Sequence, residues 1–359
     1  MKPSGISRRS FLRAGLFGTM GAAGLAALNW HGHPAPQPAG APGTATPGLY
    51  GTALEGMDMG SGTPHPMVMP DVNGEVDHAA NGFNPTDTLT DFDYGTVSTL
   101  PNGQTLREFQ INAINKEIEI APGIKFPAWV YNGRIPGPIL RVTEGDRVRI
   151  HFGNGSDHPH SMHFHGIHMA AMDGVGGEAM VQPGQTFVYE FDAEPFGLHL
   201  YHCHAAPLAR HIAKGLYGVF IIDPPGGRPP VDREFVMVMH GLDIDYDDAN
   251  DFYAVNGIPF HYQRHPVEFK VGELVRIYLV NILEFDPVNS FHLHANFFNF
   301  FPTGTSLTPT EYTDTIIQGQ AQRAILEFRY KYPGEYMFHA HKTEFAELGW
   351  TGLFKVREA

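Results

Sequence analysis

Cysteine is almost absent from this chain. Cys203 is the only one among 359 residues. A single cysteine excludes an intramolecular disulfide, so Cys203 is either a free buried thiol or a metal thiolate. Its neighbours form the run His202-Cys203-His204. Side chains alternate along an extended strand, so we expect Cys203 to face one way and both histidines the other, with the histidines roughly 7 Å apart. The run therefore predicts one metal site on each side of a short peptide.

Positive charge and long hydrophobic runs are also scarce. The chain has 24 Lys and Arg against 38 Asp and Glu, a formal net charge of −14. This balance argues against nucleic acids and anionic membrane surfaces as partners, since both require a basic patch. The apolar stretch from Ala14 to Leu28 is too short for a transmembrane helix, which needs about 20 residues. We therefore expect no membrane span.

The N-terminus has the pattern of a targeting segment. The motif SRRSFLR at residues 7–13 precedes the apolar stretch and is typical of a twin-arginine signal, which we assign to residues 1–29. That route exports folded proteins, which suits a cofactor loaded before export. No cysteine lies near the signal, which excludes lipid anchoring through a processed N-terminal cysteine. We expect a periplasmic, cell-surface or extracellular protein.

Residues 30–90 are rich in Pro, Gly, Ala and Thr and show no sustained periodicity, so they predict a linker or surface tail. Methionines flank His65 in this tail and others crowd residues 162–180. Thioethers favour Cu(I), which would suit copper delivery or cuprous oxidation. Flexible hydrophobic filler is the alternative. The methionines concerned are Met57, Met59, Met67, Met69, Met162, Met169, Met172 and Met180.

The remaining residues, about 270, are enough for two domains of ordinary size. They form two similar halves, in which residues 144–150 match 271–277 and residues 215–220 match 349–354. Short β-branched and aromatic runs separated by Pro-Gly turns predict β-sandwiches. We expect an all-β fold of two tandem Greek-key β-sandwich or barrel domains, at 91–225 and 226–359. Representative strands are predicted at Arg147–Phe152, Thr186–Phe191, Phe235–Met239 and Arg323–Phe328.

The first half has a complete blue-copper ligand set, namely two imidazoles and a thiolate with a weak or missing axial ligand. We assign His160, Cys203 and His211 as the ligands, with Leu216 in the axial position. Losing an axial donor is expected to raise the copper potential. His158 is the alternative to His160, but the three-residue step from His160 to His163 fits a strand better.

The second half has lost this ligand set. His160, Cys203 and His211 align with Asn289, Ala340 and Phe345, yet every His-x-His pair remains. Random sequence drift is not expected to remove one ligand set while it retains every His-x-His pair. The second half is therefore expected to contribute part of a shared metal cluster, whose eight histidines are His163, His165, His202, His204, His292, His294, His339 and His341.

From about residue 105 to the end, the chain resembles the multicopper oxidases, the family of laccases, ceruloplasmin and their two-domain relatives. The resemblance rests on the motifs HFHG at 163–166, HCH at 202–204, HLH at 292–294 and HAH at 339–341. Each half resembles a cupredoxin. The resemblance implies four coppers per chain: type 1 at Cys203, type 2 at His163 and His292, and a type 3 pair at the other six histidines.

The implied reaction couples one-electron oxidation of a small reducing substrate to the four-electron reduction of O2 to water. Phenols, aromatic amines and low-valent metal ions are all suitable donors, with laccase-type activity as the default. The two-domain relatives form rings of three chains, so we expect a homotrimer with a trinuclear cluster at each interface between chains.

The cluster needs protons. Asp173, in MDGV at residues 172–175, resembles the Asp-Gly that follows the first motif in laccases. Glu344 and Glu347 are further candidates for the proton relay. A solvated surface carboxylate is the alternative for each of the three. His168 is expected to form hydrogen bonds around the cluster rather than to act as a ninth ligand.

Two other functions fit parts of the pattern. Copper nitrite reductases also have two cupredoxin domains, but there the residue after the cysteine is not a ligand and the catalytic site holds one copper. A non-enzymatic copper carrier would explain the Met- and His-containing tail, but it has no need for a Cys-His link between two metal sites.

Overall fold

The computed structural model describes residues 74–359. The predicted targeting segment at 1–29 and the methionines around His65 lie outside the described residues. No helix in the described part combines the length and the apolar character needed to cross a membrane.

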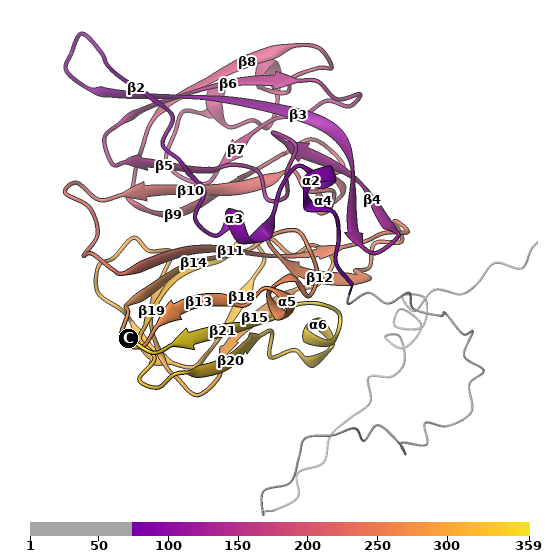
Figure 1. Cartoon of the computed structure of the whole chain (residues 1–359). Coiled ribbons are helices and arrows are strands. Elements are labelled where there is room, and N and C mark those ends of the chain that lie inside the picture. The colour runs from indigo at the N-terminus through magenta and orange to yellow at the C-terminus, as the bar shows by residue number, and fades with distance from the viewer. Residues whose placement is uncertain (1–73) are drawn as a thin grey trace, which may run out of the picture. The chain divides into compact units, whose positions relative to one another are not determined.

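The described chain is all-β, as predicted, and forms four sheets (Figure 1). The first half contributes one sheet in the order β1-β5-β10-β9-β7 and another in the order β2-β3-β6-β8, with β4 paired to β3. The strands are β1 (Phe92–Asp93), β2 (Thr96–Thr99), β3 (Thr105–Ala121), β4 (Ile124–Tyr131), β5 (Ile139–Thr143), β6 (Arg147–Asn154), β7 (His163–Phe164), β8 (Thr186–Asp192), β9 (Gly197–His202) and β10 (Tyr217–Asp223).

The second half repeats this plan in sheets ordered β12-β11-β14-β19-β16-β17 and β13-β21-β20-β15-β18. Figure 1 shows it in orange and yellow, below the indigo and pink strands of the first half. Its strands are β11 (Arg233–Leu242), β12 (Phe252–Val255), β13 (Val267–Lys270), β14 (Val275–Asn281), β15 (Val288–Leu293), β16 (Phe298–Pro302), β17 (Glu311–Thr313), β18 (Thr315–Gly319), β19 (Arg323–Phe328), β20 (Gly334–His339) and β21 (Thr351–Arg357).

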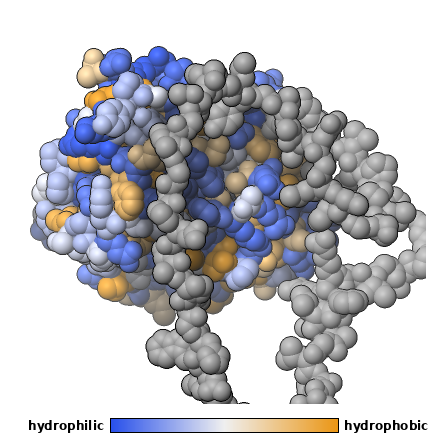
Figure 2. Space-filling view, turned by 90° about the horizontal axis from the view of Figure 1, so that it is seen from below, coloured by the Kyte–Doolittle hydropathy of each residue, from blue (hydrophilic) through white to orange (hydrophobic). Residues whose placement is uncertain are grey.

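The predicted strands lie within β6, β8, β11 and β19. In β6 every second side chain is buried, which is the period-two burial of a strand with one face on the core. In β14 all residues are buried, because both of its faces are covered. On the face in Figure 2, hydrophobic residues stand among hydrophilic ones.

A shared apolar core joins the two halves. It includes Val130 and Val219 from the first half and Val236 and Val280 from the second. Arg141 spans the same junction, where its guanidinium donates to Asp223 at 2.7 Å and to Glu234 at 2.8 Å. The covered guanidinium is therefore paired with two carboxylates, as buried charge requires.

Part of the predicted tail packs onto the cores. Residues 74–90 include the short helices α2 (His78–Asn81) and α3 (Pro85–Thr88). Val76 and Leu89 are buried, and the carbonyl of Leu89 accepts a hydrogen bond from Val236 N at 2.9 Å. Apolar anchors hidden in a Pro- and Thr-rich stretch have no periodicity, which is why the sequence predicted a tail here.

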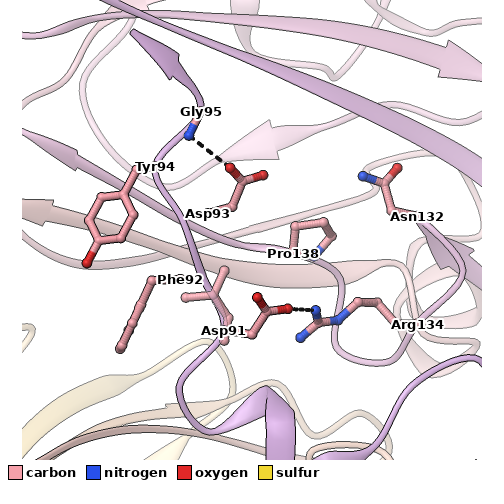
Figure 3. Close-up of a pocket in the computed structure, with 9 residues that line it drawn as sticks. Asp91, Phe92, Asp93, Tyr94, Gly95, Asn132, Arg134 and Pro138 are labelled. Atoms are coloured by element: carbon pink, nitrogen blue, oxygen red, sulfur yellow. Dashed lines mark hydrogen bonds and ion pairs between the residues drawn. The ribbon is translucent and has the colours of Figure 1, made fainter.

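The chain then enters β1 along a polar hollow of about 460 Å³ (Figure 3). Asp91 pairs with Arg134, and Asp93 accepts a hydrogen bond from Gly95 N at 2.8 Å. None of the described residues that line this hollow is a histidine or a cysteine, so its contacts anchor β1 and do not suggest a metal site.

Candidate metal centre

Three side chains from separate segments meet in the core of the first half. His160 precedes β7, Cys203 follows β9, and His211 lies in α4 (Leu208–Ala213). Cys203 Sγ is 3.7 Å from His160 Nδ1 and 3.3 Å from His211 Nδ1, and the two Nδ1 atoms are 3.1 Å apart. The exposed fraction is 0% for His160 and Cys203 and 2% for His211. These two nitrogens and one sulfur form a closed ligand set, which we call the thiolate site.

Neighbouring groups orient these ligand atoms, and burial sets their protonation. His160 Nε2 is 2.7 Å from Ser156 Oγ, which orients the ring and leaves Nδ1 facing Cys203. Burial lowers the pKa of His160 to about 3 and of His211 to about 4, so both imidazoles are neutral near pH 7. Burial also raises the pKa of the Cys203 thiol. Metal binding must therefore displace a proton from Cys203.

The sulfur has additional partners suited to a thiolate. The backbone N–H groups of Ser161 and Ala205 approach Cys203 Sγ at 3.4 and 3.5 Å. The donors that stabilise negative charge on sulfur are thus already in place. The donor set fits copper, because two imidazoles and a thiolate are the ligands of a known class of copper electron-transfer site.

The structure separates the two histidine candidates. His158 pairs with Asp157 at 2.7 Å and its side chain is 50% exposed, so His160 is the histidine that reaches Cys203. Leu216 is fully buried in the core cluster that contains Cys203, and its carbonyl accepts the Cys203 N–H at 3.0 Å. Leu216 thus contacts Cys203 through the backbone, and its side chain offers no donor to a metal.

In the second half, buried apolar side chains occupy the region that corresponds to the thiolate site. Ala340, Phe345 and Trp350 are fully buried in its core. Phe345 stacks on Tyr253 with ring centroids 3.8 Å apart. Asn289 is buried and accepts a hydrogen bond from Ser290 N at 2.8 Å. These replacements offer neither a thiolate nor an imidazole, as the internal alignment predicted.

On the opposite side of Cys203, four histidines of the first half form a group. His163 on β7 is paired in register with His202 on β9. His163 lies 5.1 Å from His165, 5.2 Å from His202 and 5.2 Å from His204, measured between ring centroids. The Nε2 atoms of His165 and His202 are 3.1 Å apart. The side chains around Cys203 therefore alternate as expected.

The second half repeats this group with nearly the same separations between rings. His292 on β15 is paired with His339 on β20. His292 lies 5.0 Å from His294, 5.3 Å from His339 and 5.1 Å from His341. The Nε2 atoms of His294 and His339 are 3.0 Å apart. Two sets of converging nitrogens with the same register are what two halves of one metal cluster require.

Polar contacts orient both groups. Backbone carbonyls lie 2.9 Å from His202 Nδ1 and 2.7 Å from His339 Nδ1, leaving each Nε2 for a ligand. Ser161 Oγ accepts from His204 N at 3.1 Å, and Ser290 Oγ accepts from His341 N at 2.8 Å. Sequence reasoning missed these serines, although both directly follow aligned positions of the internal repeat.

The two four-histidine groups remain apart within one chain. In residues 74–359 no hydrogen bond or ring contact joins a histidine of one group to a histidine of the other. The second group opens onto a hollow of about 500 Å³ lined by His292, His294, Asn296, Phe297, Tyr312 and Asp314. Within the described residues, each group of histidines therefore lies without a contact to the other group.

The carboxylates predicted for proton supply lie in different settings. Asp173 Oδ1 is 3.1 Å from His163 Nδ1 and 3.9 Å from His168 Nε2. His168 Nε2 also contacts the carbonyl of Phe164 at 2.8 Å. Glu344 and Glu347 are exposed on α6 (Thr343–Glu347), where Glu344 is 3.4 Å from Lys342. Of the three predicted carboxylates, Asp173 is the one that contacts a cluster histidine.

Asp314 was not identified from the sequence. Its carbonyl is 3.1 Å from His292 Nδ1, and Thr315 Oγ1 is 2.8 Å from the same nitrogen. Thr315 in turn donates to Asp314 Oδ1 at 3.0 Å. The carbonyl of Asp173 likewise lies 2.9 Å from His163 Nδ1, so the two backbone contacts correspond, whereas only the Asp173 carboxylate reaches its histidine. The internal repeat was the available signal, but no His-x-His motif marks this position.

Comparison with known proteins agrees with this geometry. Family models described as multicopper oxidase match residues 112–227 and 233–359. A crystal structure of a multicopper oxidase is 62% identical, with a TM-score of 0.78, covering 79% of this chain and 100% of that chain.

Nitrite reductases are also similar. The copper-containing nitrite reductase of Neisseria meningitidis is 32% identical over 274 residues, 70% of this chain and 69% of that protein. The copper nitrite reductase of Nitrosomonas europaea is 28% identical with a TM-score of 0.64, covering 70% of this chain and 94% of that chain. With both halves matched by its models, the chain belongs to the multicopper oxidase family and is a copper oxidoreductase with two cupredoxin-like domains.

Proposed function

We propose that this protein couples one-electron oxidation of a small reducing substrate to the reduction of O2 to water. Four substrate electrons and four protons convert one O2 into two waters. The observation that carries the proposal is the pair of matching four-histidine groups, one of them joined through the backbone to Cys203. We assign residues 91–225 and 226–359 as the two functional domains.

Copper, when bound, would accept electrons singly at Cys203 and supply them to O2 at the histidine cluster. The protein's own contribution is a covalent path from the Cys203 sulfur through the backbone to the adjacent His202 and His204. Both imidazoles lie with His163, whereas the sulfur lies with His160 and His211. The path therefore links the buried thiolate site to the cluster without any diffusing carrier.

Paired histidines favour an oxidase over a nitrite reductase. A one-copper catalytic site needs few imidazoles, and the residue after the cysteine has no ligand role in such a site. Here the backbone N–H of His204 donates to Ser161 Oγ, and the centroid of the His204 ring lies 5.2 Å from that of His163. His341 takes the same place in the second half, 5.1 Å from His292. Four oriented imidazoles per half suit a three-copper cluster.

The copper content of the purified protein tests this proposal. We expect close to four coppers per chain by elemental analysis, together with O2 consumption when a phenol is supplied. A content near two coppers per chain, with nitrite reduction, would instead assign the protein to the nitrite reductases. Full copper loading without O2 consumption, with both phenols and Cu(I) as donors, would favour a copper carrier.

We propose a homotrimer as the active assembly. Large exposed hydrophobic side chains flank both histidine groups, which favours burial of these faces between chains. Ile167 is 59% and Met169 62% exposed beside the first group, and Ile317 is 73% exposed on β18 beside the second. A head-to-tail contact that repeats with closing rotation gives a ring. Each interface would then bring two half-sites together.

An aromatic surface lies outside the thiolate site and suits a laccase-type substrate. Trp129 is 4.6 Å from His211 and 4.6 Å from the exposed His158, between ring centroids. Lys214 Nζ lies 4.9 Å from the Trp129 ring and 4.4 Å from the Tyr246 ring. Planar aromatic donors can stack on Trp129, so that only this ring separates them from His211.

The twin-arginine motif leads us to propose that the reaction takes place outside the cytoplasm.

Asp173→Asn should slow O2 reduction by about a hundredfold, the usual effect of losing a positioned proton donor. The amide retains the size of the carboxylate and the backbone contact with His163, so blue absorption and copper content should not change. Steady-state O2 uptake measures the effect. Glu335→Gln, which alters an exposed carboxylate 3.7 Å from Lys355, is the matched control. Equal rates in both variants would exclude Asp173 from proton supply.

Leu216→Met should lower the potential of copper in the thiolate site, because the thioether supplies the axial donor that leucine lacks. A spectroscopic redox titration of the blue absorption measures this. The buried leucine is of similar volume, so the fold should tolerate the exchange. An unchanged or raised potential would place Leu216 away from the axial position.

A further inference from the structure

A third group of histidines lies where the N-terminal segment meets the second half. His78 begins α2, while His261 begins α5 (His261–Arg264) and His265 directly follows it. The ring centroid of His261 is 5.0 Å from that of His78 and 4.6 Å from that of His265. One ring nitrogen from each residue can be chosen so that all three lie within 4.8 Å of one another.

The nitrogens of this group are short of partners. Both ring nitrogens of His78 and the Nδ1 of His261 are buried without a hydrogen bond. Buried polar atoms are almost always satisfied, so three such atoms at one point need an explanation. His261 Nε2 is 2.8 Å from Thr86 Oγ1, which orients this 1% exposed ring and directs Nδ1 toward the group.

A carboxylate lies beside His265 at the edge of this group. Glu75 Oε2 is 3.0 Å from His265 Nε2. Its other oxygen is 3.7 Å from Arg264 Nε, so the glutamate already has one cationic neighbour as well as the imidazole. The i and i+4 spacing of His261 and His265 places both rings on one side of a single helical turn.

From this arrangement we propose a further metal site, separate from the copper centres, that holds one divalent ion with affinity for imidazole, Zn²⁺ or Cu²⁺. The nitrogens of His78, His261 and His265 would be its ligands, with Glu75 as the fourth. Three imidazoles and a carboxylate suit either ion. Burial lowers the pKa of His261 to about 2, so its nitrogen is a neutral donor at ordinary pH.

The consequence of binding is structural. Glu75 and His78 belong to the segment that precedes β1, whereas His261 and His265 belong to the second half. One ion would therefore cross-link two stretches that are far apart in the sequence. It would also give a partner to His261 Nδ1 and to one of the two ring nitrogens of His78. In residues 74–359 no hydrogen bond or ring contact joins this group to the copper-ligand groups, so the copper sites should be unaffected.

Metal analysis of the copper-loaded, full-length protein tests this. After equilibration with low micromolar Zn²⁺ and gel filtration, we expect one zinc per chain in addition to the copper. The double variant His78→Gln, His265→Gln should lose this zinc, with affinity reduced by about a hundredfold or more in calorimetric titration. Zn²⁺ should also raise the Tm of the unmodified protein but not of the variant. If Cu²⁺ is the ion preferred, equilibration with Cu²⁺ should give one additional copper that the variant lacks.

The control is His151→Gln, because His151 and Glu108 form a similar partly exposed pair, 3.1 Å apart. This variant should bind the additional ion normally. Retained blue absorption shows that each variant is folded, and Glu75→Gln, at an exposed position, should weaken binding in the same direction if the double variant does not fold. Equal metal content in the unmodified protein and the double variant would overturn the proposal. An equal loss in His151→Gln would show adventitious surface binding only.

Discussion

Replacing Cys203 with serine is expected to abolish both the intense blue absorption and O2 reduction. The serine hydroxyl remains protonated at neutral pH and cannot supply the thiolate that holds copper with His160 and His211. The substitution also removes the sulfur atom from the covalent path that leads to His202 and His204. Turnover with a phenol should fall to background, while absorption spectroscopy records the loss of colour.

The eight-histidine cluster should still load copper in this variant, so elemental analysis should show a loss of one copper per chain rather than of all. His158→Ala is the matched control, since that ring lies near the site but pairs with Asp157. It should retain the blue colour. Persistent colour in Cys203→Ser, or loss of colour in His158→Ala, would contradict the ligand assignment.

Placing a charge on the exposed face of the second half should dissociate the proposed trimer and eliminate O2 reduction. Ile317→Asp puts a carboxylate at a 73% exposed position whose strand partner is Ser290, next to the second histidine group. Burying an unpaired charge in an interface is strongly unfavourable. Light scattering of the unmodified protein should give about three times the chain mass, and of the variant about one chain mass.

The variant should keep its blue colour, because the thiolate site lies within one half, but it should lose the copper bound by the histidine cluster. Val97→Asp is the control, since Val97 is 55% exposed on β2, a strand with no cluster histidine. It should remain trimeric and active. A monomer with full copper content and full O2 reduction would show that the cluster forms within one chain.

The sequence by itself determined the donor types, their order and the all-β class. Adjacent ligands such as His202, Cys203 and His204 are placed on opposite sides by backbone alternation alone, which is a local property. The internal repeat likewise revealed that Asn289, Ala340 and Phe345 had replaced one ligand set. These conclusions need only spacing and chemistry, so they required no knowledge of how the strands pack.

Only the tertiary structure decided which distant residues meet. It brought His160, rather than His158, to Cys203 and His211. It also showed that the carbonyls of Asp173 and Asp314 lie in matching places beside His163 and His292. It also placed His78 against His261, a pairing for which the chain carries no motif. Contacts of this kind depend on sheet register and loop packing, which are set by the whole core rather than by neighbours in the sequence.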